Sequence, residues 1–196
     1  MKILSTFAVV EESLYSVLYD TEVGAVDDDG VVIANEKLHE FRRLFDFWND
    51  SLRLRAFFEE HEEDLKDAYW DGITIDEAIE KTRAEAKELE AVLLEYAEAG
   101  KTIRLKNLSM LFKPLSDGKF EKEFEKDKVK VDGKKKWIRL YAIRIEANLF
   151  IVCGGAIKLR KTLNDRTYLL KELEKLEITR DYLMDEDGDV LDLFEL

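Results

Sequence analysis

The stretch WIRLYAIRIEANLFIVCGGAIKLRKT, residues 137–162, contains two apolar segments joined by the short connection EAN. β-Branched and aromatic residues dominate both segments, and a connection of this length is typical of a β-hairpin. We therefore predict that Trp137–Ile145 and Leu149–Lys161 are antiparallel neighbours in a sheet. The second strand ends in two glycines and a group of three cations, although the whole chain has a formal net charge of −13.

A two-residue turn at Ala147-Asn148 would fix the register of this hairpin, because side chains alternate between the two faces of a strand. One face is then almost wholly apolar and is assigned to the core: Ile138, Leu140, Ala142, Ile151, Cys153, Gly155, Ile157 and Leu159. The other face collects polar and aromatic side chains: Trp137, Arg139, Tyr141, Lys158 and Arg160. In this register Gly154 leaves room beside Tyr141, and Gly155 permits a bend or bulge.

The basic face has a clear chemical interpretation. Lys and Arg bind phosphate, and Arg does so through a planar fork. RNA phosphodiester cleavage needs no metal when cations stabilise the transition state and the 2′-hydroxyl is held in line. The alternative is an ordinary solvated sheet face, on which basic residues are common.

The rest of the chain predicts an α+β fold. Residues 36–100 show helical periodicity, and Thr74 and Glu77 have the spacing of a capping box that opens a long helix ending at Gly100. Residues 101–162 form the sheet region and residues 164–184 a closing helix. We predict a single domain over residues 1–184, with an antiparallel meander and helices packed on one face of the sheet. Residues 185–196 form an acidic tail.

Composition narrows the functional class. Residues 1–100 carry 26 acidic and 10 basic side chains, whereas residues 101–162 carry 7 acidic and 17 basic ones. This pattern fits either an anion-binding face on an acidic body or mutual neutralisation on folding. Cys153 is the single cysteine, so no internal disulfide can form, and His39 and His61 show no zinc spacing. We expect a cytoplasmic protein with no metal, no cofactor and no membrane segment.

Residues 111–183 resemble the RelE/HigB-type toxins. FKPLSDGKFEKEF is similar to the family's entry into the sheet, and WIRLYAI is similar to one of its central strands. LFIVCGGAIKLRKT looks like the family's last strand, and NDRTYLLKELEKLEITRDYL looks like its closing helix. The resemblance implies a small α+β ribonuclease that cleaves mRNA, often on the ribosome, and that a cognate antitoxin protein silences.

The resemblance also implies roles for individual residues. Arg139 would bind phosphate, Arg160 with Lys158 would stabilise the transition state, and Tyr168 would complete the catalytic set. Trp137, Tyr141 and Lys161 would contact the substrate. Two features favour a different role, that of a non-catalytic RelE-fold interaction module of phage or mobile-element origin. The chain is acidic where the family is basic, and Leu159 stands inside the basic run KLRKT.

Overall fold

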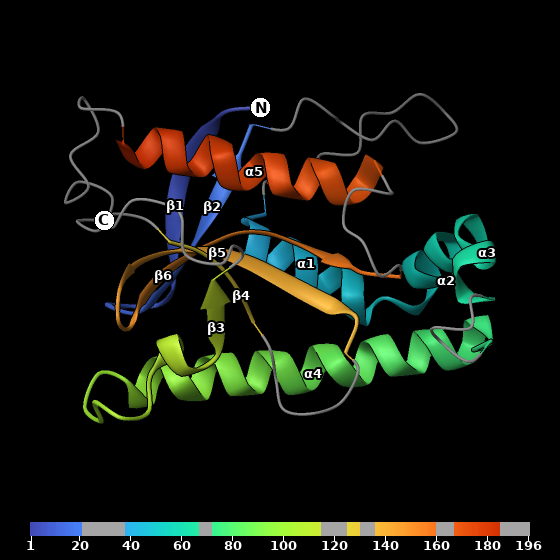
Figure 1. The fold of residues 1–196 in the computed structure, drawn as a ribbon, viewed down its shortest axis with the longest axis horizontal. Coiled ribbons are helices and arrows are strands. Elements are labelled where there is room, and N and C mark those ends of the chain that lie inside the picture. The colour runs from blue at the N-terminus through green and yellow to red at the C-terminus, as the bar shows by residue number, and fades with distance from the viewer. Residues whose placement is uncertain (21–37, 67–71, 115–124, 130–135, 160–166, 185–196) are drawn as a thin grey trace.

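The computed structural model describes residues 1–20, 38–66, 72–114, 125–129, 136–159 and 167–184. Figure 1 shows a mixed sheet with helices above and below it. The elements, in chain order, are β1 (Ile3–Val10), β2 (Leu14–Tyr19), α1 (Glu40–Asn49), α2 (Ser51–Glu60), α3 (Glu62–Leu65), α4 (Ile75–Ala99), the 3₁₀ turn η2 (Leu108–Met110), β3 (Phe112–Pro114), β4 (Glu125–Val129), β5 (Ile138–Glu146), β6 (Leu149–Ile157) and α5 (Thr167–Met184).

The described strands form one six-stranded sheet in the order β1-β2-β6-β5-β4-β3. Strands β3, β4, β5 and β6 are antiparallel neighbours in chain order, so the predicted meander and the predicted hairpin are confirmed. The prediction of a wholly antiparallel sheet is wrong, because β2 runs parallel to β6. The long helical region between β2 and β6 gives the chain the crossover that a parallel pair requires.

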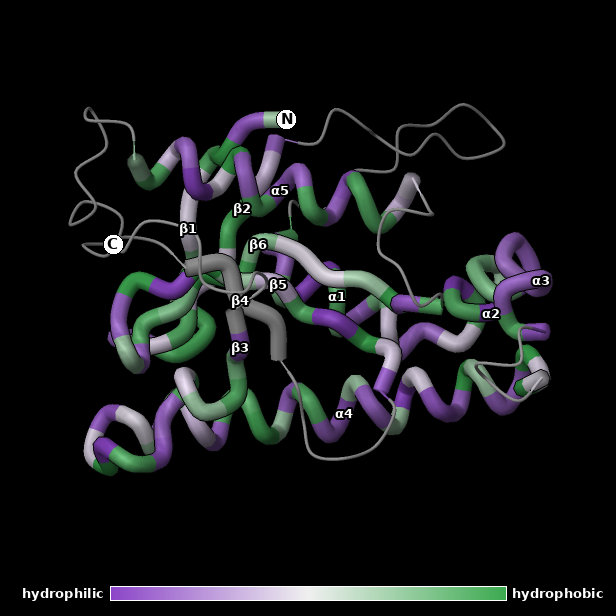
Figure 2. The backbone as a smooth tube through the Cα atoms, in the orientation of Figure 1, coloured by the Kyte–Doolittle hydropathy of each residue, from purple (hydrophilic) through white to green (hydrophobic). Residues whose placement is uncertain are grey.

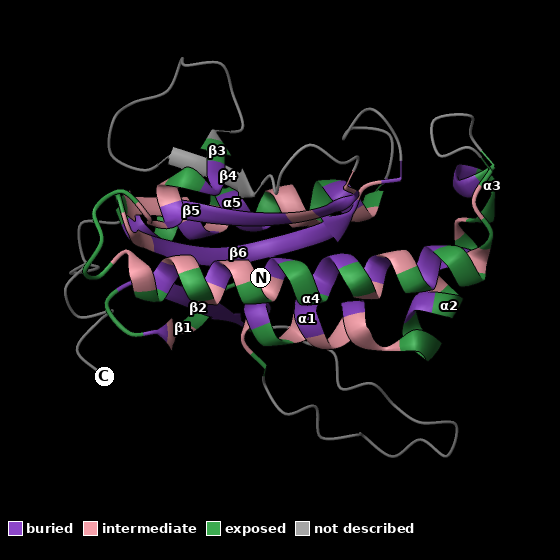
Figure 3. Ribbon diagram, turned by 90° about the horizontal axis from the view of Figure 1, so that it is seen from below, coloured by how far each residue is buried: buried purple, intermediate pink, exposed green. Residues whose placement is uncertain are grey.

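Helices cover both faces of the sheet, which corrects the prediction of helices on one face only. The larger apolar cluster joins α1, α2 and α4 to one face, and the smaller one joins α5 to the other. In Figure 1 the long helices α4 and α5 lie on opposite sides of the sheet. Figure 3 shows the consequence, because β6 is buried along nearly its whole length and β5 is buried through its middle. Leu169, Leu176 and Leu183 form an apolar stripe along α5. This stripe is buried against the face of the sheet that carries the smaller apolar cluster.

A β-bulge at Cys153 changes the faces of the hairpin. The predicted pairs Ile138–Ile157, Leu140–Gly155 and Tyr141–Gly154 are all present. Ala142, however, pairs with Val152 rather than with Cys153, so β6 holds one extra residue. Because a bulge shifts the alternation by one position, Cys153 and Ile151 lie in the smaller cluster beneath α5, not in the larger core to which we assigned them.

Local signals set the helix ends. Thr74 and Glu77 form the predicted capping box, and Gly100 is the C-cap of the 25-residue helix α4. The Asp50 carboxylate accepts hydrogen bonds from the N–H groups of Leu52 and Arg53 and so begins α2. Figure 2 shows hydrophobic and hydrophilic residues alternating along α4, as expected for a helix with one buried face.

Candidate functional site

The face on which we expected a phosphate site is not an open surface. Tyr141 is fully buried beneath α5, and burial raises the pKa of its phenol well above the ordinary value. The Arg139 guanidinium turns to the backbone: its Nη1 donates to the carbonyl oxygens of Lys136 (2.9 Å) and Ile138 (2.8 Å). An arginine held by neutral carbonyls still carries its full charge, but fewer of its donors remain for a phosphate.

The other predicted residues divide into three groups. Trp137 belongs to the larger core on the opposite side, where its ring lies 5.5 Å from that of Phe58. It therefore does not share a surface with Tyr141. The backbone N–H of Lys158 donates to the carbonyl of Trp137 across 2.8 Å, which continues the hairpin one pair beyond β6. Arg160 and Lys161 lie outside the described residues.

Tyr168 lies near the end of β6. Its hydroxyl donates to the Ile157 carbonyl across 2.9 Å. The His61 ring stacks on the Tyr168 ring with 5.0 Å between centroids, and Phe57 meets Tyr168 edge-on. Sequence reasoning missed His61 as a neighbour of this group, because more than a hundred residues separate it from Tyr168 along the chain and no local pattern joins them.

The two parallel strands separate beyond a short region of pairing. Strand β2 pairs with β6 only from Leu14 to Ser16. Farther along β2, no backbone hydrogen bond joins it to β6 among the described residues. There the Tyr19 hydroxyl donates instead to the carbonyl of Cys153 (3.0 Å) or of Lys175 (3.1 Å). It also lies 2.7 Å from Thr179 Oγ1. The opening between the strands is therefore filled by side chains rather than by backbone.

Four charged side chains occupy this opening and join α1 to α5. Lys175 Nζ lies 3.0 Å from Glu40 and 2.8 Å from Glu172, and Arg43 lies 2.7 Å from Glu40. Burial alone would raise the pKa of the Glu40 carboxyl, but hydrogen bonds and charge from Arg43 and Lys175 outweigh it and hold that pKa below its usual range. The two cations and the two anions compensate each other's charge. We call this group of Glu40, Arg43, Glu172 and Lys175 the charged clasp, because it links α1 to α5.

Close packing on both faces of β6 explains the two glycines. A Cβ on Gly154 would lie 2.8 Å from the Glu172 carboxylate, and a Cβ on Gly155 would lie 2.8 Å from the Arg139 carbonyl and 2.9 Å from the Trp48 ring. Gly154 therefore makes room for α5, not for Tyr141 as the register had suggested. Gly155 makes room for α1 on the opposite face. The glycines let helices approach β6 closely on both sides.

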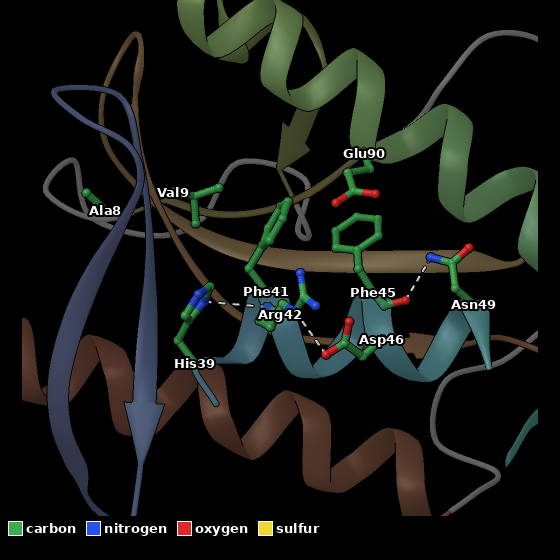
Figure 4. A pocket seen from close by; sticks show the side chains of 9 residues that line it. All are labelled: Ala8, Val9, His39, Phe41, Arg42, Phe45, Asp46, Asn49 and Glu90. Atoms are coloured by element: carbon green, nitrogen blue, oxygen red, sulfur yellow. Dashed lines mark hydrogen bonds and ion pairs between the residues drawn. The ribbon is translucent and has the colours of Figure 1, made fainter. Parts of the chain in front are cut away.

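A separate hollow of about 360 Å³ lies between β1, α1 and α4. Figure 4 shows the rings of Phe41 and Phe45 at its centre and Glu90 reaching from α4 toward the Phe45 ring. The lining residues are Ala8, Val9, His39, Phe41, Arg42, Phe45, Asp46, Asn49 and Glu90. Phe41 and Phe45 are themselves buried in the larger core, at 5% and 3% exposure, so the accessible wall of the hollow is formed largely by polar side chains.

The charges around the hollow are unequally paired. The Arg42 guanidinium donates to Asp46 across 3.0 Å, so these two charges compensate each other. Burial and the nearby Arg42 charge lower the pKa of the His39 imidazole. Within the described part of the chain, Glu90 makes no hydrogen bond or ion pair. The hollow therefore offers one carboxylate that is available to a ligand.

Neither a metal cluster nor a membrane helix is found in the described residues. No group of three or more His, Cys, Asp or Glu side chains gathers there in a way that could hold a metal ion. No helix within those ranges is both long enough and apolar enough to cross a bilayer. Comparison with protein families, with curated proteins and with solved structures found no match for this chain.

Proposed function

We propose that the chain is a non-catalytic protein-interaction module with a RelE/HigB-like fold. The observation that carries this proposal is the coverage of the sheet. Helices α1 and α4 occupy one face and α5 the other, so the central strands offer no open basic platform to RNA. The hollow beside β1 is a concave feature whose largely polar wall includes the Glu90 carboxylate.

Strand β1 adds a second argument for a protein partner. Its eight residues, ILSTFAVV, carry no charge, although 38% of the chain is charged. Among the described strands it lies at the edge of the sheet, and its side chains Leu4 and Phe7 are 44% and 43% exposed. Edge strands are normally protected by charges, so an uncharged edge with exposed apolar residues favours association with another chain.

The test is site-specific photocrosslinking in the source cells. A benzoylphenylalanine replaces Phe7 beside the hollow in one full-length variant, and replaces Glu174 on the far helix α5 in a matched control. We expect one discrete protein adduct from position 7 and none from position 174. The proposal is overturned if neither position gives a protein adduct, or if both give the same mixture.

A metal-independent mRNA endoribonuclease is the second candidate, because one observation favours it. Arg139 and Tyr141 on β5 pair with Ala156 and Gly154 on β6, and the Tyr168 hydroxyl donates to the Ile157 carbonyl at the end of β6. The buried Tyr141 hydroxyl has no hydrogen-bond partner among the described residues. Several predicted site residues are thus neighbours around the end of β6, and His61 adds a group able to transfer protons.

The two candidates differ in their effect on a cell. The ribonuclease candidate requires that induced expression arrest growth and leave cut mRNA, and that Tyr168→Phe abolish both. The interaction module requires normal growth and intact mRNA on induction. Salt-sensitive RNA binding by the purified full-length chain would support the ribonuclease and count against the module.

A further inference from the structure

We propose that the edge strand β1 pairs with β1 of a second copy of this chain, so that the two sheets join across a two-fold axis. This inference rests on the proposed interaction function and identifies the partner as the chain itself. Antiparallel pairing about an axis at Phe7 would place Thr6 of one copy opposite Ala8 of the other. A symmetric contact between identical surfaces is the commonest way in which identical chains associate.

The two edges of the described sheet differ in their protection against strand pairing. The edge strand β3 is three residues long and contains Lys113 and Pro114, and its short length, its lysine and its proline all oppose the addition of a strand. The opposite edge strand, β1, is eight residues long, carries no charge and exposes Leu4 and Phe7. Among the described strands, β1 is therefore the edge that can accept another strand.

The charges at the two ends of β1 favour an antiparallel copy of the same strand. Lys2 precedes the strand and Glu11 and Glu12 follow it, and all three residues are exposed. Within the described residues, none of these three side chains forms an ion pair. Antiparallel pairing about Phe7 would bring Lys2 of one copy beside Glu12 of the other, twice by symmetry, whereas parallel pairing would place like charges together. A second copy thus supplies the charges that complement this edge.

The residues between these charges are compatible with self-pairing. Strand β1 pairs regularly with β2 from Ser5 to Ala8, between two irregularities in register, and this regular segment contains Phe7. Phe7 would meet its symmetry copy at the axis, and aromatic pairs are among the favourable pairs across two strands. The Phe7 ring also stacks on His39 of its own chain, with 5.6 Å between centroids, which helps to orient it.

The first experiment measures the mass of the purified full-length protein by sedimentation equilibrium over a series of concentrations. We expect a reversible monomer–dimer equilibrium in the micromolar range, because a single strand pair gives a small interface. Phe7→Lys places two like charges at the axis and should weaken dimerisation by about tenfold or more. Leu105→Lys makes the same kind of change at an apolar residue that is 85% exposed in the loop after α4, and should alter dimerisation by less than about twofold. Circular dichroism checks that both variants are folded.

An exchange of charges tests the arrangement without altering the apolar residues of β1. Lys2→Glu should weaken dimerisation by about fivefold at low salt, because an exposed ion pair is replaced by like charges on both sides of the axis. Adding Glu12→Lys to the same chain restores opposite charges across the axis. This double variant should recover the wild-type affinity to within about twofold.

Three results would overturn the inference: a monomer at every concentration up to about 1 mM, a dimer that Phe7→Lys does not weaken, or a double variant no tighter than Lys2→Glu alone. The photocrosslink at position 7 separates this failure from failure of the interaction function. If the purified chain is monomeric and position 7 gives an adduct with a different protein, the interaction function survives and self-pairing fails. An adduct of twice the mass of the chain supports both.

Discussion

The Glu172 carboxylate on α5 accepts a hydrogen bond from the backbone N–H of Gly155 on β6 across 2.9 Å. A helix side chain thus satisfies a strand N–H at the place where β2 and β6 have separated. The same carboxylate lies 2.8 Å from Lys175, which reaches Glu40 on α1. The Glu172 carboxylate therefore links β6 to the charged clasp between α1 and α5.

Adding a methyl group at Gly155 should destabilise the fold. In Gly155→Ala the new Cβ would meet the Arg139 carbonyl at 2.8 Å and the Trp48 ring at 2.9 Å, and a backbone atom cannot move away cheaply. We expect the free energy of unfolding to fall by about 1–3 kcal/mol, the usual cost of overpacking a core. Urea denaturation measures the change.

Gly72 provides the control for that variant. Its φ is +67°, and a Cβ placed there meets no atom within 4 Å. Asparagine tolerates this left-handed conformation better than most residues, so Gly72→Asn should lower the free energy of unfolding by less than about 1 kcal/mol. Equal losses in the two variants would show that close approach at Gly155 is not the cause.

Removing the cation of the clasp should be costly. The Lys175 side chain is only 7% exposed, and Lys175→Met leaves Arg43 as the one remaining cation of the clasp beside the buried Glu40 carboxylate and the partly buried Glu172 carboxylate. Breaking a buried ion pair by removing one partner typically costs about 3–5 kcal/mol of unfolding free energy. The matched variant Lys171→Met, exposed on the same helix, should change stability by less than about 0.5 kcal/mol. Thermal and urea unfolding measure the stability of both variants. Equal losses of unfolding free energy in Lys175→Met and Lys171→Met would contradict a stabilising role for the clasp.

Acid should weaken the wild type through Glu40. The pKa of this carboxyl is held below its ordinary value in the folded state, so the unfolded chain binds the proton more readily. Its contribution is therefore fully present above the ordinary carboxyl pKa and is lost as the pH falls through the lower folded value. Glu40→Gln should be less stable than wild type at pH 7, and the difference should stay constant until the pH falls below the ordinary carboxyl pKa and then narrow toward pH 3. A constant difference across that range would contradict the assignment.

The Cys153 thiol should be inert while the protein is folded. It is fully buried beneath α5, and burial raises the pKa of the thiol, which suppresses the reactive thiolate. A thiol reagent such as dithionitrobenzoate should give no rapid reaction with the native chain and one equivalent of colour in urea. Rapid labelling of the native protein would show that α5 does not remain closed over β6.

The sequence determined much of the local architecture. Alternating residues set the hairpin of β5 and β6. The predicted pairs hold at the turn, Glu146–Leu149, and again from Tyr141–Gly154 onward, whereas the pairs between these points are shifted by one residue. Thr74 and Glu77 set the beginning of α4, and Gly100 set its end. These features could be predicted because each depends on residues that are close together along the chain.

The tertiary structure alone decided which surfaces remain open. The bulge at Cys153 and the clasp of Glu40 with Lys175 bring α5 over the face predicted to be solvated, and the clasp joins residues that lie 135 positions apart. The hollow likewise depends on Phe41, Glu90 and Val9, which come from three elements. Periodicity shows that a strand or helix has an apolar side, but which element covers that side is settled only when distant segments compete to remove apolar surface from water.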